Sequence, residues 1–443
     1  MNLRNNLFKL LFEFTLKLRG ESFYDILALY EKNQYLPKDR LTSIQLEKLN
    51  SIISWAKSNT IYYSDKVPSK ITSLEELASI PLLDKDILRA NQNQLISKFG
   101  HLQRSKTSGG STGAPVSIIK NSKGIAQEMA ASWRAYHWAG IKVGDRQARF
   151  WGIPRNLKER ARSKLIDIIC HRIRITAFGY NDKSFDRSVI KLERFNPDYL
   201  YGYTSIIEEL ANYIETTKRK PKLNICSVIT TSEALSRPTR ERIESVFGCR
   251  VFDEYGCGEV GTIAHECEHG RLHLNMENSI IEVIDTKGNP VLPGQAGEIV
   301  VTDLTNYSMP LIRYRIKDYG VIRPTPCECG RTLDVLDSVF GREYDALINS
   351  KGEKFHGEFF LYIAEDAKKL GHMIQGIQFI QSSHNTITIR VAPSKPSKSL
   401  ESFMTNRIQD QFDHSFYVNY EWVNEISREP SGKLRVVKYE SKS

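Results

Sequence analysis

The sequence lacks an uninterrupted apolar run long enough to cross a bilayer. Residues 3–19 are rich in leucine and phenylalanine, but Lys9, Glu13 and Lys17 interrupt them, whereas a spanning helix needs about 20 mostly apolar residues. The helical spacing with basic neighbours fits packing on the protein's own domain or an interfacial position on a membrane, and we expect the first. The sequence therefore predicts a cytoplasmic protein without membrane association.

Cysteine is scarce and odd in number. Seven cysteines stand at irregular spacing, which is not the even framework of a disulfide-stabilised secreted domain. Free thiols and metal ligands remain as their uses. The chain also lacks internal repeats, and its one low-complexity tract is the lysine-serine end.

The charge balance is basic, because 62 lysines and arginines outnumber 52 acidic residues. A net charge of +10 and a pI near 9.1 fit three kinds of partner: a nucleic acid, an anionic membrane surface, or a polyanionic small molecule such as a nucleotide. The basic residues are scattered, and neither a zinc-finger spacing nor an RNA-recognition aromatic signature is present. Nucleic acid is therefore the weakest of the three, and we expect no nucleic-acid partner.

The length of the chain predicts more than one domain. With 443 residues, 40% of them hydrophobic and 26% charged, the chain is globular in composition and too long for one hydrophobic core. After the helical first hundred residues, short β-branched runs alternate with helices, which predicts α/β layers. The proline- and cysteine-rich tract 324–330, followed by Gly341 and Arg342, places a boundary near residue 340. We therefore expect a body at 1–340 and a small domain at 341–443.

The strongest motif reads Thr-Ser-Gly-Gly-Ser-Thr-Gly-Ala-Pro at residues 107–115. Its glycines let successive backbone N–H groups face one anion, and the hydroxyls of Ser108, Ser111 and Thr112 add donors to phosphate oxygens. Such a loop can hold a triphosphate, although no Gly-Lys-Ser/Thr makes it a Walker A motif. Taken alone, the stretch fits a flexible serine-glycine turn equally well.

Three further motifs supply two carboxylates and a lysine. Glu259 closes the stretch Asp-Glu-Tyr-Gly-Cys-Gly-Glu after an apolar run, where a carboxylate can hold Mg²⁺. Asp318 ends a strand-like stretch, where one carboxylate can accept hydrogen bonds from both hydroxyls of a ribose. Lys433 follows the tight Ser-Gly turn at 431–432, and its ammonium suits negative charge building at phosphorus. Each residue alone also fits an ordinary solvated surface position.

In this order, the four motifs resemble the adenylate-forming superfamily, and more narrowly the phenylacetate-coenzyme A ligase-like branch that includes capsule-biosynthesis adenylating proteins. The resemblance spans nearly the whole chain. Residues 56–63 (AKSNTIYY) and 80–88 (IPLLDKDIL) are similar to N-terminal signatures of that branch. The resemblance implies a large α/β body with sheets packed on helices and a small, mobile α+β C-terminal lid.

The resemblance also implies a reaction. A carboxylic acid and ATP form acyl-AMP, and the acyl group then passes to a thiol, from coenzyme A or a carrier protein, or to an amine such as an amino sugar. Surface polysaccharide biosynthesis is one setting that fits. The implied cofactors are ATP and Mg²⁺, and coenzyme A is a candidate acceptor; the acid and the oligomeric state are not implied.

The resemblance assigns roles residue by residue. It implies that Glu259 binds Mg²⁺, that Asp318 holds the ribose, and that Lys433 bridges the substrate carboxylate and the α-phosphate. Gly341 and Arg342 resemble the hinge motif, with Arg342 near the nucleotide. The remaining implied nucleotide contacts are Ser108, Gly109, Gly110, Ser111, Thr112 and Gly113 at the phosphates, Ser232, Glu233 and Ala234 beside the adenine, and Tyr255 and Gly256.

Three positions depart from the family pattern. Gly109 and Gly110 form a pair where one glycine is usual, and Gly258 replaces a hydroxyl residue, so both changes weaken expected ATP contacts. Tyr344 stands where the hinge usually has an aspartate or lysine, with Asp345 beside it, so the hinge residue is not fixed. The first two departures favour a second hypothesis, in which a noncatalytic relative of the fold acts as a binding or scaffold protein.

Four residues can supply a structural zinc site. Cys327 and Cys329, together with Cys267 and His273, are the soft and borderline ligands of a tetrahedral zinc, and some relatives have a similar pattern. The C-x-C spacing is tighter than usual and the two halves lie far apart, so buried free thiols are the alternative. His265 and His269 can replace His273 as a ligand. Three other cysteines, Cys170, Cys226 and Cys249, are expected in the core.

The sequence does not identify the acid. Several aromatic side chains fit either an acyl pocket or the hydrophobic core. They are Trp133, Tyr136, His137, Trp138, Phe150, Trp151, Tyr201 and Tyr203.

Overall fold

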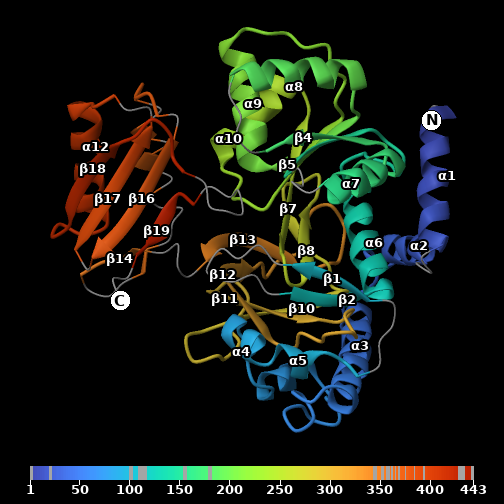
Figure 1. The fold of residues 1–443 in the computed structure, drawn as a ribbon. Coiled ribbons are helices and arrows are strands. Elements are labelled where there is room, and N and C mark those ends of the chain that lie inside the picture. Colours follow the sequence, from blue (N-terminus) through green and yellow to red (C-terminus); the bar gives the residue numbers. More distant parts are fainter. Residues whose placement is uncertain are drawn as a thin grey trace. The chain divides into compact units, whose positions relative to one another are not determined.

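The largest element of the computed structural model is an eleven-stranded sheet with the order β10-β11-β12-β13-β9-β8-β7-β6-β5-β3-β4 (Figure 1). The chain divides into two compact units. The first is Met1–Ile316 with Val321–Asp337, and the second is Lys317–Gly320 with Ser338–Ser443. The structure describes residues 3–18, 22–98, 103–107, 117–152, 157–177, 182–342, 347–350, 354–355, 360, 363–364, 366–367, 370–374, 376–383, 385–392, 395–427 and 435–440.

Five neighbouring strands of the sheet run parallel in the order β4-β3-β5-β6-β7. They are β3 (Gln147–Trp151), β4 (Arg172–Thr176), β5 (Tyr199–Tyr203), β6 (Ser227–Thr231) and β7 (Arg250–Cys257). The helices between them in sequence are α7 (Leu157–Ile169), α8 (Asp182–Phe195), α9 (Thr204–Thr216) and α10 (Arg237–Phe247). Every residue of β5 and β6 is buried, as in strands covered on both faces. Because the carboxyl ends of parallel strands meet at one edge, a ligand site is expected there.

The other strands extend the sheet from β7. β8 pairs antiparallel with β7 and with β9, β9 pairs with β13, and β10 pairs with β11. Their bounds are β8 (Gly261–Glu266), β9 (Leu272–Leu274), β10 (Ser279–Ile284), β11 (Ala296–Asp303), β12 (Tyr314–Ile322) and β13 (Val335–Arg342).

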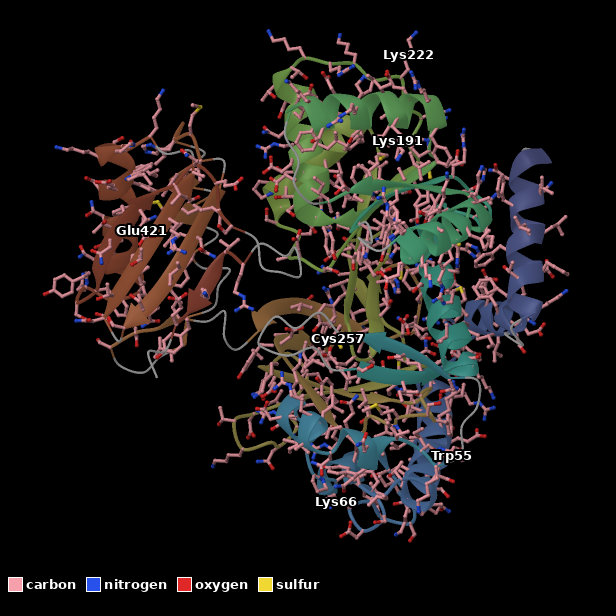
Figure 2. All side chains as sticks on the ribbon, viewed as in Figure 1. Trp55, Lys66, Lys191, Lys222, Cys257 and Glu421 are labelled. Atoms are coloured by element: carbon pink, nitrogen blue, oxygen red, sulfur yellow. The ribbon has the colours of Figure 1, made fainter. Side chains whose placement is uncertain are left out.

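Helices and one hairpin make up the N-terminal part of the first unit. They are α1 (Leu3–Leu18), α2 (Phe23–Asn33), α3 (Lys38–Asn59), the 3₁₀ helix η1 (Leu74–Ser79), α4 (Lys85–Ala90), α5 (Gln92–Leu95), the antiparallel hairpin β1 (Gln103–Thr107) and β2 (Ser117–Asn121), and α6 (Ser122–Trp138). Trp55 of α3 donates a hydrogen bond from Nε1 to the carbonyl oxygen of Tyr307 at 2.8 Å (Figure 2). Within the described residues, no helix is long and apolar enough to cross a membrane.

A buried ion pair fastens α6 to the sheet. Arg134 is fully buried, and its Nη1 donates to both carboxylate oxygens of Glu277 at 2.8 and 3.0 Å. Its Nη2 donates to Asn275 Oδ1 at 3.1 Å. Such a pair is retained because removing one partner would leave the other charge buried and alone.

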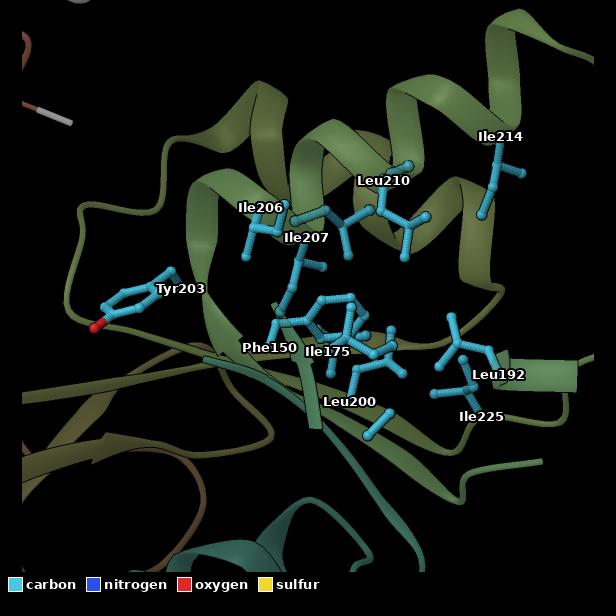
Figure 3. Close-up of a cluster of buried hydrophobic side chains, with 14 of the residues drawn as sticks. Phe150, Ile175, Leu192, Leu200, Tyr203, Ile206, Ile207, Leu210, Ile214 and Ile225 are labelled. Carbon is cyan, nitrogen blue, oxygen red and sulfur yellow. The ribbon is translucent and has the colours of Figure 1, made fainter. Parts of the chain in front are cut away.

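The main core of the first unit lies on one face of the parallel strands. Side chains alternate along β3, so that Ala148 and Phe150 enter this core while Arg149 faces the other way. Figure 3 shows Phe150, Ile175 and Leu200 from the strands facing Ile207 and Leu210 of α9. The opposite strand face carries the polar and aromatic side chains described below.

The second unit combines a small sheet with helix α12. Its four-stranded sheet has the order β18-β17-β16-β19, and aliphatic and aromatic residues from both strands and helix, such as Phe379 and Met404, form its core. The bounds are β14 (Leu347–Ile348), β15 (Lys354–Phe355), β16 (Gly376–Ser383), β17 (Thr386–Ala392), α12 (Lys398–Gln411), β18 (Tyr417–Trp422) and β19 (Val437–Tyr439). The predicted fold class, a large α/β body with a small α+β domain, is confirmed. The domain boundary near residue 340 stays a prediction.

Candidate functional site

Several residues predicted to contact the nucleotide lie at the ends of two neighbouring parallel strands. In the register of β6 and β7, Thr231 lies opposite Glu254. Ser232, the first residue after β6, has a positive φ of 70°, so the chain turns sharply as it leaves the sheet. The carboxylate of Glu233 accepts a hydrogen bond from the backbone N–H of Ser205 at 2.7 Å, at the start of α9. This hydrogen bond holds the turn at the start of α9, and the register of β6 and β7 places the turn beside Tyr255 and Gly256 of β7.

Glu259, the predicted magnesium ligand, lies in the tight turn between β7 and β8. Two glycines make this turn possible. A Cβ on Gly256 would lie 2.3 Å from the carbonyl oxygen of Gly261, and one on Gly261, where φ is +105°, would lie 2.4 Å from the carboxylate of Glu128. Glu259 is buried, and its Oε1 lies 3.2 Å from Nζ of Lys85. The predicted metal carboxylate therefore already has a cation beside it.

The predicted phosphate loop lies outside the described residues, from Ser108 through Gly113, but the strands on either side of it are described. Thr107 of β1 lies opposite Ser117 of β2. On β2, the Lys120 ammonium donates to Glu128 Oε2 at 2.7 Å and to the carbonyl oxygen of Val260. Burial alone would lower the pKa of Lys120, but the Glu128 and Asp303 carboxylates outweigh it and raise the pKa. The base of the loop is thus fastened to the turn that carries Glu259.

The segment IPLLDKDIL positions Lys85. The backbone N–H of Leu83 donates to Arg313 O at 3.0 Å, and the N–H of Arg315 donates to Leu83 O at 2.8 Å. Asp84 then caps α4 by accepting hydrogen bonds from the next turn, including Ile87 N at 2.8 Å. We recognised this segment in the sequence as a family signature but assigned no role to Lys85. The sequence offers only the presence of a lysine within the signature as a sign of this role, because its partner Glu259 is remote in the chain.

Three other predicted residues belong to the second unit. Asp318 lies on β12 and is buried. Arg342 is the last residue of β13, and its side chain is outside the described set. Lys433 and the two hinge candidates, Tyr344 and Asp345, lie wholly outside the described residues. The ribose, hinge and catalytic roles of these residues remain predictions.

A buried carboxylate stands next to the adenine-side residues. Glu254 accepts hydrogen bonds from the hydroxyls of Tyr136 and Tyr201, both at 2.9 Å, and lies 3.3 Å from Nε2 of His265. Burial would raise the pKa of Glu254, but His265 and the two tyrosines outweigh burial and hold it below its usual value. This network fixes the end of β7 before Tyr255.

Asp253, on the opposite strand face, behaves differently. Burial raises its pKa to about 7, and repulsion from the neighbouring Glu266 carboxylate acts in the same direction. Its carboxylate accepts hydrogen bonds from the hydroxyl of Thr230 at 3.2 Å and from the backbone of Glu254, which only partly offset burial. Since the unfolded group titrates near 3.8, the folded chain holds more protons between these pKa values, and stability falls as the pH rises through that window.

We therefore expect Asp253→Asn to remove this loss. The difference in the free energy of unfolding, variant minus wild type, should be larger at about pH 8 than at about pH 5. The increase should be roughly 2 kcal/mol or more. Urea unfolding at both pH values measures this difference. Asp65→Asn, at an exposed carboxylate, is the control and should show no such change. Equal pH dependence of wild type and Asp253→Asn would contradict the assignment.

The four predicted zinc ligands come together. One ligand atom from each of Cys267, His273, Cys327 and Cys329 lies within 4.8 Å of the others. The two sulfurs of Cys267 and Cys327 are 3.7 Å apart, and His273 Nε2 is 3.2 Å from Cys329 Sγ. A tetrahedral zinc with Zn–S bonds of about 2.3 Å separates two sulfurs by about 3.8 Å. The spacing fits a metal and is too long for a disulfide.

The surroundings of this Cys3His cluster also fit zinc. His273 Nδ1 lies 3.2 Å from the carbonyl oxygen of Leu333, which leaves Nε2 facing the sulfurs, as in many histidine metal ligands. Burial lowers the pKa of His273 to about 4, so the imidazole is neutral. The backbone N–H of His269 donates to Cys267 Sγ at 3.4 Å. These contacts prepare the side chains to accept a cation.

The other histidines and cysteines lie elsewhere. His265 faces Glu254, and His269 lies 3.7 Å from Glu328, so within the described part of the chain neither joins the cluster. Cys170 and Cys249 are half-buried against apolar clusters. The expectation of a core position was wrong for Cys226, which is exposed because it lies at the end of the loop that enters β6.

The aromatic candidates for an acyl pocket separate into groups. Trp151 and Tyr203 stack at 4.4 Å near the carboxyl ends of β3 and β5. The guanidinium of Arg149 lies over Trp151 and Tyr201, 4.7 and 4.9 Å from their ring centroids. Phe150 belongs to the opposite core. The others lie elsewhere. Trp133 and Tyr136 of α6 pack with Tyr201 of β5. His137 pairs with Glu31, and Trp138 packs on His273.

Comparison with known proteins adds two family matches. A family described as AMP-binding enzyme matches residues 107–307, and the CapK C-terminal domain matches residues 347–440. Protein CapK from Staphylococcus aureus is 21% identical over 407 residues, which cover 89% of this chain and 88% of that protein. Phenylacetate-coenzyme A ligase from Thermus thermophilus is 24% identical over 337 residues, covering 71% and 73%.

The chain belongs to the adenylate-forming superfamily, in its phenylacetate-coenzyme A ligase-like branch.

The fold agrees with this assignment. A crystal structure of 2-hydroxyisobutyryl-CoA ligase in the postadenylation state, with 2-HIB-AMP, has a TM-score of 0.75 and 20% identity, and covers 93% of this chain and 92% of that one. Within this adenylate-forming chain, the AMP-binding match falls on the first unit and the CapK match on the second. The chain is therefore an AMP-forming ligase with adenylation of the acyl-coenzyme A ligase type.

Proposed function

We propose that this ligase converts a carboxylic acid and ATP into acyl-AMP and pyrophosphate, and then transfers the acyl group to a thiol or an amine. One observation carries the proposal. The turn with Glu259, the base of the glycine-rich loop and the ends of β6 and β7 are joined within the first unit by Lys120, Glu128 and backbone contacts. A nucleotide with its metal is the ligand whose parts match these groups.

Each element has a role in the proposal. Glu259 would hold Mg²⁺, and a buried carboxylate that already attracts an ammonium at 3.2 Å fits that role. Bound Mg²⁺ would stabilise charge on the departing pyrophosphate. The loop 108–113 would surround the phosphates, Asp318 would hold the ribose, and Lys433 would neutralise charge as the carboxylate attacks the α-phosphorus.

The acyl acceptor is the finer part of the proposal. The ligase named phenylacetate-coenzyme A ligase acts with coenzyme A, which favours a thiol, and we infer coenzyme A or a carrier-protein pantetheine as the first choice. An amino sugar in surface polysaccharide biosynthesis is the alternative. We further propose that the C-terminal domain turns about the segment near Arg342 between the two steps, and that the reaction occurs in the cytoplasm, where ATP is available.

Release of pyrophosphate from ATP in the presence of a panel of acids tests the first step. The panel contains aryl, fatty, hydroxy and amino acids, and dicarboxylic acids because Arg149 forms no ion pair with any described carboxylate. We expect acid-dependent release with at least one class. Coenzyme A, pantetheine and amines are then compared as acceptors by the product formed. If ATP binds but no acid elicits release, the noncatalytic binding or scaffold hypothesis replaces this one.

Lys85 provides a separate prediction about the nucleotide. Lys85→Met should raise the KM for ATP by about ten- to a hundredfold, because a charge-assisted hydrogen bond to phosphate contributes about 1.5–3 kcal/mol. The kcat should change much less, and Lys85→Arg should retain most of the affinity. Lys66→Met is the control, because Lys66 is an exposed lysine that pairs with its neighbour Asp65 (Figure 2). An unchanged KM for ATP in Lys85→Met would show that the lysine only balances Glu259.

A further inference from the structure

Helix α1 is fastened to the first unit by one of its two apolar faces. Phe12 and Leu16 are buried, and the ring of Phe8 stacks on His171 at 3.7 Å. Asn5 donates to Asp145 Oδ1 at 3.0 Å, and a Cβ on Gly144 would lie 2.4 Å from the Asn5 carbonyl oxygen. The expectation that this helix packs on its own domain is thereby confirmed.

The opposite face of α1 is also apolar and remains uncovered. Leu7, Leu10 and Phe14 keep 63%, 61% and 59% of their surface exposed. Their spacing of three and four residues puts them on one stripe of the helix. The sequence pattern alone did not separate the two faces, because apolar residues occur on both. Packing of the inner face leaves the outer stripe for another partner.

Helix α7 lies in contact with α1 and carries a second stripe of the same kind. Leu157, Leu165 and Ile168 are exposed and lie on one face at intervals of eight and three residues, and α7 has no buried residue. Basic side chains flank this stripe on both sides. The exposed basic residues of α7 are Lys158, Arg160, Arg162 and Lys164.

We propose that the outer faces of α1 and α7 together form a docking surface for an anionic lipid bilayer. In sequence, the two helices hold seven basic residues against three acidic ones, and one of the acids, Asp167, is paired with Arg172 and Arg174. An apolar stripe bordered by Lys and Arg is the pattern of a helix that lies in the membrane interface. The net charge of +10 adds long-range attraction to an anionic surface.

The charges favour lipid over a second copy of the chain. If two copies met through this surface, the basic borders of α7 would face each other, and like charges in contact oppose association. An anionic bilayer instead complements the basic border and accepts the leucine and phenylalanine side chains. No helix among the described residues could span a membrane. The proposed surface would instead attach the ligase to the face of the bilayer.

Co-sedimentation of the full-length protein with vesicles tests this surface. We expect binding to vesicles that contain phosphatidylglycerol, little binding to phosphatidylcholine alone, and weakening with salt. Arg160→Glu combined with Lys164→Glu should reduce the partition coefficient by roughly thirtyfold or more, and Leu10→Ser combined with Phe14→Ser by roughly tenfold or more. These four side chains are exposed, so the variants should remain folded, which circular dichroism checks.

The matched control reverses two charges elsewhere. Lys220→Glu combined with Lys222→Glu changes the net charge equally at exposed lysines in the loop after α9 (Figure 2), and it should retain most vesicle binding. Absence of binding to anionic vesicles would overturn the proposal. So would an equal loss in the control, or a concentration-dependent dimer that the Leu10/Phe14 variant abolishes while vesicle binding stays unchanged. Acid-dependent pyrophosphate release is measured separately, so failure of this proposal leaves the proposed reaction untouched.

Discussion

Lys433→Ala is expected to lower the rate of acyl-AMP formation by about a hundredfold or more, while acyl transfer from preformed acyl-AMP continues at a similar rate. The reason is electrostatic. Negative charge builds at the α-phosphorus only during adenylation, so an ammonium in the role proposed for Lys433 would lower that barrier and not the next one. Pyrophosphate exchange into ATP measures the first step, and product formation from added acyl-AMP measures the second.

The design separates a lost charge from a damaged domain. Lys438 lies nearby in sequence on β19 and pairs with Glu440 at the surface, so Lys438→Ala should leave both steps near wild type. Lys433→Arg keeps the charge but changes its shape, and should retain part of the adenylation rate. If Lys433→Ala leaves pyrophosphate exchange untouched, the role assigned to this lysine is wrong. If both steps fall together, the substitution acts through the fold.

Local patterns in the sequence were sufficient to predict the architecture. The alternation of β-branched runs with helices predicts α/β layers, and the buried strand β6 is such a run, whereas the equally buried β5 contains no β-branched residue. Once the strands are parallel, their carboxyl ends meet, so motifs directly after β6 and β7 lie together. This is why residues 232–234, which follow β6, lie beside residues 255–256 of β7 although α10 separates them in the chain.

Interactions between segments that are distant in the chain could not be predicted from local sequence patterns. The pairing of Lys85 with Glu259 depends on Leu83 lying along the start of β12, and no spacing rule connects those segments. Burial was equally hard to read, since the exposed stripe of α1 and its buried stripe have the same composition. The glycines of the β7–β8 turn are an intermediate case. Their necessity follows from the approach of Glu128 to Gly261, which only the folded chain reveals.

The Cys3His cluster was easier to predict because cysteine is rare. The chain has only seven cysteines, and the C-x-C pair requires close partners if it is to bind a metal. The structure places Cys267 in a tight turn, where its N–H donates to Arg271 O at 2.9 Å, and Cys327 in another that Gly330 closes with a φ of 79°. Each turn presents its sulfur toward the same point.

The purified protein is expected to contain about one zinc per chain, and Cys327→Ser to lower both the zinc content and the free energy of unfolding, the latter by about 3 kcal/mol or more. Without a metal, burial raises the pKa of the Cys267 thiol to about 12, so this thiol is neutral. A bound zinc reverses this preference, because it favours the thiolates. Three thiolates and one zinc leave a single negative charge near Arg331, whose guanidinium lies 4.5 Å from the ring centroid of Trp138 and also pairs with Glu268 at 2.8 Å.

Elemental analysis and urea unfolding, with and without a chelator, measure these effects. Cys226→Ser is the matched control because Cys226 is exposed and lies outside the cluster, and it should keep its zinc and its stability. A chelator should destabilise wild type and leave Cys327→Ser nearly unchanged, since the variant has already lost the metal. A zinc content near zero in wild type would show that the three cysteines and the histidine hold no metal. In that case Cys327→Ser should cost no more than a single buried thiol, about 1 kcal/mol.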